Sequence, residues 1–249
     1  MSKKNYKMII SYDGSRYKGW EHQRDQETIQ GKIENVLGRL AGGDEQVEIL
    51  GAGRTDAGVH AEGMCASFFL DSQLTAEQIR DYLNRYLPDD IAVREVREAS
   101  DRFHARYNAT GKTYRYTIYN GPVKPVFDRR YVWTEEEKLD IARMKGAASV
   151  LQGKHDFASF CRLAGKNKST VRNVDDITIR QSGERIILLF HGDGFLRNMV
   201  RIMTGTIVAA GKGEIDEERI REILSARDRT IAPATAPAQG LCLVSVDYD

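Results

Sequence analysis

Hydrophobic and polar positions in the first hundred residues follow two different periods, and each change of period marks the boundary of an element. Apolar residues after Thr28 recur every three or four positions, which predicts a helix with one buried face that ends at Gly42. Thr75 and Gln78 form a capping-box signature in front of a second such helix, which Pro88 ends. The pattern predicts strands at residues 4–12, 47–50, 64–70 and 91–96.

The second half repeats this order of elements, although it does not repeat the residues. The pattern predicts strands at residues 112–119, 174–181, 185–191 and 240–248, and helices at 135–151, 195–210 and 216–226. Each half therefore follows the order β-α-β-β-α-β of a ferredoxin-like domain. We expect an α+β protein made of two fused ferredoxin-like halves, residues 1–105 and 106–249.

Composition is that of an ordinary soluble globular protein, with 41% hydrophobic and 29% charged residues in a chain of 249. The first residues contain no apolar stretch of signal-peptide type, and the longest run of aliphatic and aromatic residues, 186–190, is too short to cross a membrane. Cys65, Cys161 and Cys242 are isolated from one another, which argues against a disulfide framework or a paired-cysteine metal site. We interpret them as buried thiols of a cytoplasmic protein.

Charge is distributed unevenly, although the net charge is only +1. Residues 102–130 contain seven Lys or Arg and one acid, and residues 154–172 contain five and one. Acidic residues gather instead at 135–140 and 214–222. Segregated blocks of this kind either give the protein one positive face for nucleic acid or are simply solvated surfaces.

One stretch between two predicted strands contains an arginine, an aspartate and a histidine together with three glycines. It is residues 51–61, Gly-Ala-Gly-Arg-Thr-Asp-Ala-Gly-Val-His-Ala. The glycines allow sharp turns and close approach to a ligand. A plain turn explains Asp56 followed by Gly58, but it does not require Arg54 and His60 as well. We therefore interpret the stretch as a functional loop held by a rigid scaffold.

Two further segments carry candidate functional side chains. Tyr114 and Tyr116 lie on one face of a predicted strand, either as core residues or, with the basic residues beside them, as a platform for stacking bases. Arg201 lies in an apolar helical segment with no acidic residue within four positions. Such an arginine needs an anion from elsewhere in the fold or must extend to water. We regard Asp56 as a candidate for that anion.

Several common enzyme classes lack their signatures. No Gly-Lys-Ser/Thr follows the glycines, and they do not match the dinucleotide fingerprint. No Gly-x-Ser-x-Gly motif of a serine hydrolase occurs, and no group of residues has metal-ligand spacing. The sequence thus predicts neither a nucleotide cofactor nor a metal.

Taken together, these motifs resemble those of the tRNA pseudouridine synthases of the TruA type. Residues 53–60 are similar to that family's catalytic loop, and the other matches occur in order across the whole chain. They are Tyr12-Asp13-Gly14 with Tyr17, Gly19, Trp20 and Gln23; residues 112–116; residues 194–201; and Ala236-Pro237-Ala238 with Gly240-Leu241.

The resemblance implies a homodimer without a cofactor, in which a continuous, mainly antiparallel sheet carries helices on one side and the active-site cleft lies between the halves. It implies isomerisation of uridine to pseudouridine in the anticodon stem-loop of tRNA, at positions 38, 39 and 40. By position, Asp56 would be the catalytic carboxylate, Tyr114 the residue against the target base, and Arg201 the partner of Asp56. Arg54 would help to hold the displaced nucleotide and the surrounding RNA.

The implied chemistry suits these residues. Uracil leaves C1′ of the ribose, turns and rejoins through C5, so no redox cofactor is needed. A carboxylate can attack an electrophilic carbon or act as a base at the sugar, and the sequence does not decide between the two. A facing guanidinium would favour the charged carboxylate. A base within a stacked stem must also be flipped out to react.

Two other interpretations remain open at this level. An RNA-binding module without catalytic activity accounts for the sheet, the tyrosines and the basic blocks, but it leaves Asp56 and Arg201 unexplained. A metabolic enzyme with a small anionic substrate leaves the broad basic blocks without a purpose.

Overall fold

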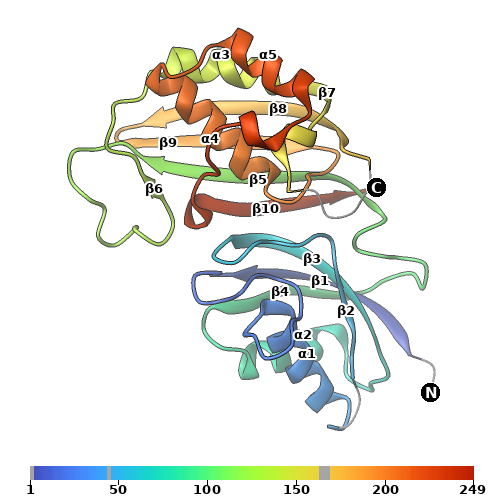
Figure 1. Cartoon of the computed structure of the whole chain (residues 1–249). Helices are drawn as coiled ribbons and strands as arrows, with labels where there is room; N and C mark the ends of the chain where they lie inside the picture. The colour runs from blue at the N-terminus through green and yellow to red at the C-terminus, as the bar shows by residue number, and fades with distance from the viewer. Residues whose placement is uncertain (1–2, 44–45, 163–168) are drawn as a thin grey trace. The chain divides into compact units, whose positions relative to one another are not determined.

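The computed structural model describes residues 3–43, 46–162 and 169–249, and the chain divides into two compact units (Figure 1). The first comprises residues 1–110 and 243–249, and the second comprises residues 111–242. The last strand, β10 (Leu241–Tyr248), therefore begins in the second unit and ends in the first. The predicted halves, residues 1–105 and 106–249, place all of this strand in the C-terminal half.

The first unit has the predicted order of elements. It contains β1 (Lys4–Tyr12), α1 (Ile29–Leu40), β2 (Ile49–Gly51), β3 (His60–Leu70), α2 (Ala76–Tyr86) and β4 (Ile91–Glu98). The strands pair antiparallel in the order β4-β1-β3-β2, with Met8 of β1 facing Ala66 of β3 on one side and Val96 of β4 on the other. This is the strand order expected when each helix crosses from one strand to a non-adjacent one.

Both predicted helix starts in the first unit are confirmed. The Thr28 side chain accepts a hydrogen bond from the backbone of Gly31, and Thr75 and Gln78 form the reciprocal capping box. Helix α1 packs against α2, and α2 packs against β4. The core that they close is made of alternate β1 residues and the apolar helix faces. It includes Tyr6, Met8, Ile10, Ile29, Ile33, Leu37, Ile79 and Leu83, all at most 1% exposed.

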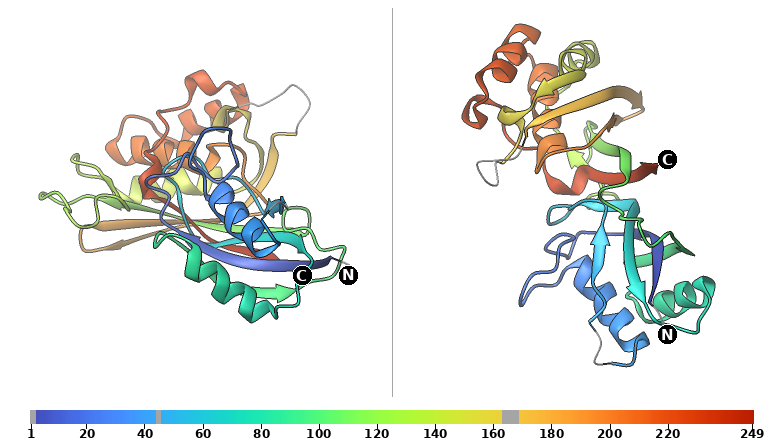
Figure 2. Two further views of the ribbon diagram at one scale, coloured as in Figure 1. Left: turned by 90° about the horizontal axis from the view of Figure 1, so that it is seen from below. Right: turned by 90° about the vertical axis from the view of Figure 1, so that its right-hand side faces the viewer.

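The second unit repeats the plan with additions. It contains all but the first two residues of β5 (Ala109–Tyr119), and it contains β6 (Trp133–Thr134), α3 (Ile141–Leu151), β7 (Gly153–Asp156), β8 (Val171–Ser182), β9 (Arg185–Gly192), α4 (Met199–Lys212) and α5 (Glu217–Ala226). The strands are ordered β5-β9-β8-β7, and β6 pairs parallel to β5. The predicted hairpin is confirmed, with β8 and β9 lying side by side (Figures 1 and 2) and Gly183 at positive φ in its turn.

The predicted α+β class with mainly antiparallel pairing is confirmed, but two helix starts were wrong. Helix α3 begins at Ile141 rather than 135, because the Asp140 carboxylate accepts from the backbone of Ala142 and Arg143 at 2.8 and 3.1 Å. Helix α4 begins at Met199 rather than 195, because Asn198 takes a left-handed conformation with φ of 65°. Strand β7 was not predicted. Part of the second basic block, residues 163–168, lies outside the described residues.

The far end of β10 is built into the first unit. The Tyr248 hydroxyl donates to the Ala105 carbonyl at 2.6 Å, and the Lys7 ammonium lies 3.8 Å from the centre of the Tyr248 ring. A Cβ on Gly63 of β3 would lie 2.4 Å from the Val244 carbonyl oxygen, so the two strands approach closely there. The first unit therefore depends on residues from the far end of the chain.

Cys65, Cys161 and Cys242 are buried thiols, as predicted. Within the part of the chain that the structure describes, no helix is both long enough and apolar enough to cross a membrane.

Candidate functional site

The glycine-rich loop joins β2 to β3, so its predicted place between two strands is confirmed. Strand β3 begins at His60 rather than at 64, which shortens the loop to residues 52–59. The Val59 amide donates to the Asp56 carbonyl at 3.1 Å, and Gly58 has a φ of 79°, so Asp56 opens a tight turn. The Asp56 side chain is half-buried.

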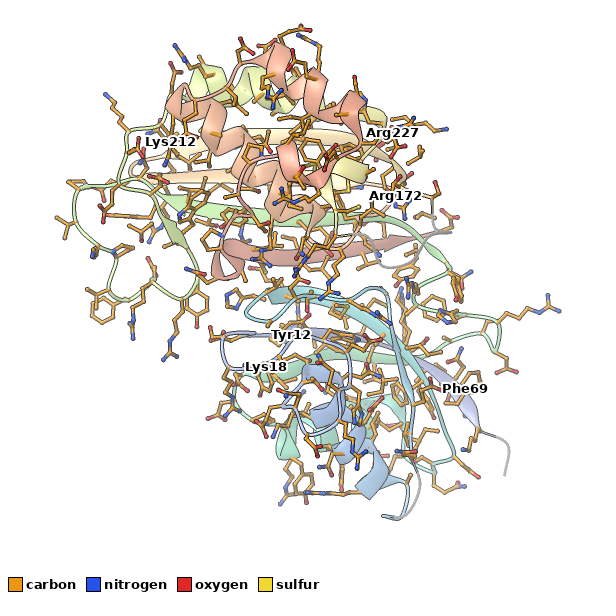
Figure 3. The ribbon with its side chains drawn as sticks, in the orientation of Figure 1. Tyr12, Lys18, Phe69, Arg172, Lys212 and Arg227 are labelled. Atoms are coloured by element: carbon orange, nitrogen blue, oxygen red, sulfur yellow. The ribbon has the colours of Figure 1, made fainter. Side chains whose placement is uncertain are left out.

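The loop that follows β1, residues 13–25, supports the backbone on which Asp56 stands. The Trp20 amide donates to the Thr55 carbonyl at 3.1 Å. The hydroxyls of Tyr12 and Thr55 hydrogen-bond at 2.8 Å, with Tyr12 at the end of β1 (Figure 3). Thr55 is buried and is held through both its backbone and its side chain. The residue directly before Asp56 is thus fixed from two directions.

Two glycines of this supporting loop allow the two backbones to touch. A Cβ on Gly19 would lie 2.6 Å from the Thr55 carbonyl oxygen, and Gly19 has a φ of 102°. A Cβ on Gly14 would lie 2.0 Å from the Val59 carbonyl oxygen. Both positions therefore require glycine, which explains in physical terms why they belong to the N-terminal motif.

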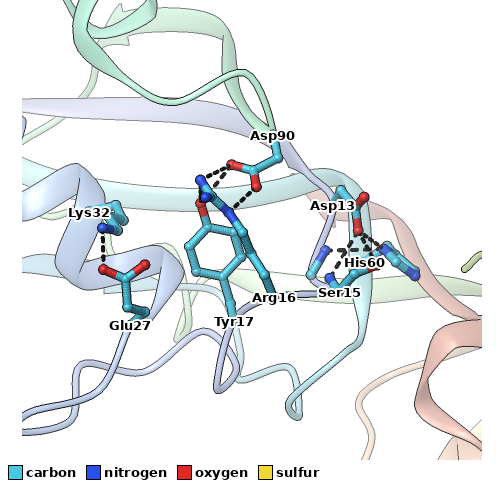
Figure 4. A network of polar contacts seen from close by, with 9 residues as sticks. Asp13, Ser15, Arg16, Tyr17, Glu27, Lys32, His60 and Asp90 are labelled. Carbon is cyan, nitrogen blue, oxygen red and sulfur yellow. Dashed lines mark hydrogen bonds and ion pairs between the residues drawn. The ribbon is translucent and has the colours of Figure 1, made fainter.

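His60, for which the sequence predicted no role, ties the other end of the loop to β1. The Gly14 amide donates to Nδ1 of His60 at 3.1 Å. Asp13 Oδ1 lies 3.1 Å from the same nitrogen and accepts from the backbone and hydroxyl of Ser15 at 2.9 and 2.6 Å (Figure 4). The buried imidazole therefore positions the loop.

Asp90, which no sequence pattern singled out, anchors the supporting loop through Arg16 and Tyr17 (Figure 4). Its carboxylate accepts from the Tyr17 hydroxyl at 2.6 Å and from Arg16 Nη2 at 3.1 Å, and its carbonyl accepts from the Asp13 amide at 2.9 Å. Tyr17 is 2% exposed. Burial and the hydrogen bond to Asp90 together raise the pKa of Tyr17 to about 12. We call Arg16, Tyr17 and Asp90 the clamp.

Arg54 lies on the outside of the glycine-rich loop. It forms an ion pair with Glu21, and the two side chains are 64% and 44% exposed. Ion pairs between exposed side chains contribute only about 0–1 kcal/mol, so an incoming phosphate can compete for this guanidinium. The Arg54 guanidinium is thus accessible from solvent.

The two tyrosines of β5 have different environments in the second unit. Tyr116 is fully buried, its hydroxyl donates to the Pro237 carbonyl at 2.7 Å, and burial raises its pKa. Tyr114 is 8% exposed, and its ring meets that of Phe195 edge-on at 5.2 Å. Tyr116 is therefore a core residue, and Tyr114 keeps a small exposed area beside another aromatic ring.

Arg201 lies in the first turn of α4 and is half-buried. Its Nε donates to the Ala236 carbonyl at 2.8 Å, and Nη1 contacts Asn198 Oδ1 at 3.3 Å. The Ala236 amide donates back to the Arg201 carbonyl at 3.1 Å. The segment around residues 236–240 thus holds both Arg201 and Tyr116, which brings three separate sequence motifs together in the second unit.

The described residues supply a carboxylate on a rigid loop, an exposed arginine beside it, and an aromatic ring and an arginine fixed in the second unit. A carboxylate held in this way can act as a nucleophile or as a base. Among the residues that the structure describes, no group of three or more His, Cys, Asp or Glu side chains is placed to hold a metal ion.

Comparison with known proteins gives one consistent result. A family model described as tRNA pseudouridine synthase matches residues 8–108 and 147–249. The tRNA pseudouridine synthase A of Bacillus sp. strain KSM-64 is 46% identical over 245 residues, which cover 98% of this chain and 99% of that protein. The tRNA pseudouridine synthase A 1 of Clostridium tetani is 45% identical over 246 residues, 98% of this chain and 100% of that protein. The tRNA pseudouridine synthase A of Acetivibrio thermocellus is 42% identical over 245 residues, with coverage of 98% and 100%.

Proposed function

The chain belongs to the tRNA pseudouridine synthases, and from this membership we propose that it acts on uridines 38, 39 and 40 of the anticodon stem-loop. It is an isomerase that forms pseudouridine in tRNA. In this reaction the bond between N1 and C1′ breaks, a bond between C5 and C1′ forms, a proton leaves C5 and N1 gains one. No electrons are gained or lost overall, so we expect the enzyme to need no cofactor.

Asp56 is the catalytic carboxylate in this proposal and acts as a nucleophile. The observation that carries the assignment is the rigidity of its backbone. Thr55, directly before Asp56, is hydrogen-bonded to Tyr12 and Trp20. Val59, three positions after Asp56, packs its carbonyl closely against Gly14. These backbone contacts support the proposal, because a fixed backbone limits the positions that the carboxylate can take, and a nucleophile held in the right orientation lowers a barrier substantially.

Three other side chains have supporting roles in the proposal. Tyr114 lies against the target base, and Arg201 pairs with Asp56 and keeps it charged. Arg54 holds the displaced nucleotide and neighbouring RNA, in keeping with its exposure and its weak surface ion pair. The target base is flipped out of the stem before reaction, because a stacked base is inaccessible to a side chain. We further propose that the enzyme is a homodimer in the cytoplasm.

The decisive experiment compares Asp56→Asn with wild type on an unmodified tRNA transcript labelled with tritium at uracil C5. We expect Asp56→Asn to release no tritium while its Kd for tRNA stays within about threefold of wild type, because the substitution removes only the charge. Asp81→Asn, on the exposed side of α2, is the matched control and should release tritium at the wild-type rate.

Two results would count against the proposal. Full turnover by Asp56→Asn would remove this residue from the chemistry. Tight tRNA binding by wild type without any release would favour the non-catalytic RNA-binding module. Mapping pseudouridine in the product then tests positions 38, 39 and 40 directly.

A further inference from the structure

A long irregular loop, residues 120–132, joins β5 to β6 in the second unit. Figure 1 shows it in green, extending away from the strands that it connects. Excursions of this length without regular structure are uncommon in compact domains and are usually functional. The residues that the family model matches, 8–108 and 147–249, do not include this loop.

The loop exposes apolar side chains to an unusual degree. Phe127 is 94% exposed, Val123 72%, Val126 63% and Tyr131 47%. Of the eight large hydrophobic side chains that are exposed among the described residues, these four lie within nine consecutive positions. An apolar cluster of this kind on a surface normally marks an interaction site.

The loop is also well braced from within. At its base, the Asn120 side chain donates to the carbonyls of Glu135 and Glu137 at 2.8 and 2.7 Å. Near its tip, Arg185 pairs with Asp128, and the Tyr131 amide donates to the Asp128 carbonyl at 2.7 Å. Phe127 therefore projects from a fixed turn, and a partner that binds it gains contact area at a low cost in conformational entropy.

Charge decides which partner fits. Lys124, Arg129 and Arg130 are all exposed, and Asp128, the only acid of the loop, is already paired with Arg185. The loop therefore presents aromatic surface together with positive charge. A second copy docked loop to loop would bring like charges together, which costs free energy. An RNA strand offers both phosphates for the cations and base faces for the phenyl ring.

We propose that residues 123–131 form an RNA-contacting arm. Phe127 stacks on an unpaired or unstacked base of bound tRNA, and Lys124 and Arg129 contact phosphates of the same strand. The inference rests on the proposed action on tRNA, and it adds a contact surface in the second unit that is separate from the four site residues predicted from the sequence.

The test measures Kd for an unmodified tRNA transcript by filter binding at several salt concentrations. Loss of one stacking contact typically weakens binding by about 5- to 100-fold, and we expect Phe127→Ala to fall in that range with an unchanged salt dependence. Lys124→Gln and Arg129→Gln should each weaken binding and reduce the slope of log Kd against log salt by about one. Phe69→Ala is the control for an exposed phenyl ring. Phe69 is 41% exposed and lies at the opposite end of the first unit's sheet from Tyr12 (Figure 3).

Sedimentation of each variant separates the two possible partners. A Phe127→Ala protein with the wild-type oligomeric state and weaker tRNA binding supports the arm. Binding within twofold of wild type, or a change of oligomeric state, overturns it, and the latter would place the loop in a protein interface. If wild type binds tRNA but forms no pseudouridine, the proposed function fails while the comparison of Kd values still decides the role of the arm.

Discussion

The hydroxyl of Tyr17 donates a 2.6 Å hydrogen bond to Oδ1 of Asp90, and this bond fastens the supporting loop, residues 13–25, to the turn before β4. Arg16 closes the clamp by donating to both of them, at 3.0 Å to Tyr17 and 3.1 Å to Asp90. Together these three hydrogen bonds join the supporting loop to the turn before β4. Their effect passes through Gly14, Gly19 and Trp20, whose backbone meets that of the glycine-rich loop.

Tyr17→Phe removes the hydroxyl and keeps the ring. We expect kcat on tRNA to fall by about tenfold with KM changed less than threefold, because loosening the supporting loop misplaces Asp56 without removing any RNA contact. Steady-state kinetics at a temperature where circular dichroism shows both proteins fully folded measures this. Glu27→Gln breaks the 2.6 Å pair with Lys32 beside the clamp (Figure 4) and should leave kcat unchanged. Equal kcat values for Tyr17→Phe and wild type would mean that the clamp only stabilises the fold.

The raised pKa of Tyr17 has a consequence at alkaline pH. A tyrosine whose pKa rises from 10 to about 12 on folding contributes stability that is complete below pH 10 and is lost as the pH rises toward 12. We therefore expect the free energy of unfolding of wild type to fall more steeply between pH 10 and 12 than that of Tyr17→Phe. Urea unfolding at intervals across this range tests the difference. Tyr116 and Tyr248 are present in both proteins and cancel in the comparison. Parallel curves would show that Tyr17 ionises alike in the folded and unfolded chain.

Gly19→Ala tests the close approach of the two loops. Gly19 and Gly42 have similar positive φ angles of 102° and 112°, but a Cβ on Gly42 meets nothing within 4 Å. Gly42→Ala should cost about 1 kcal/mol of stability from backbone strain alone and leave activity intact. Gly19→Ala adds a clash with the Thr55 carbonyl, so we expect a larger loss of stability together with a drop in kcat. Urea unfolding and tritium release measure both, and the same behaviour in the two variants would contradict this account of the packing.

Arg201 tests the proposed ion pair. We expect Arg201→Met to abolish pseudouridine formation and Arg201→Lys to retain part of it, since lysine keeps the charge but not the planar guanidinium. Both variants also lose the bond from Nε to Ala236. Arg229→Met is the matched control, because Arg229 donates to Ala232 and Thr235 in the same segment at 2.9 and 3.0 Å. Full activity in Arg201→Met would dismiss the pair, and inactivity of Arg229→Met would assign the effect to the segment instead.

The periodic pattern predicted most elements correctly because each of them buries one face and is bounded by local signals. Thr28 and Thr75 show this, since each is a cap that acts within its own helix turn. At each of the two wrong helix starts a later residue begins the helix, Asp140 as the cap of α3 and Asn198 as the cap of α4. Glu135 looks like the first helical residue, but its amide donates to the Tyr119 carbonyl of β5. The two residues are 16 positions apart in the sequence, so a pattern of neighbouring residues does not reveal this contact.

The site was predictable only where its residues lie close together in the sequence. Asp56 and Arg54 lie within one short motif and can be recognised from it. Asp90 supports their loop from 34 positions beyond Asp56, in a turn that looks like any Pro-Asp-Asp turn. Its role comes from the meeting of β1 and β4, which is a property of the folded sheet. The placement of Asp56 relative to Arg201, and a cleft between the halves, stay predictions.

The closing of the first unit by residues 243–249 sets an order of events during synthesis. Residues 1–110 leave the ribosome early, yet Gly63, Lys7 and Ala105 must wait for Val244 and Tyr248 to emerge before their contacts form. Until then β2 covers only residues 66–68 on that border of β3, and the part around Gly63 is open to pairing with another nascent chain. A catalytic loop that leads directly into β3 is thus completed only when nearly the whole polypeptide has been translated, which delays activity until the second unit has been made.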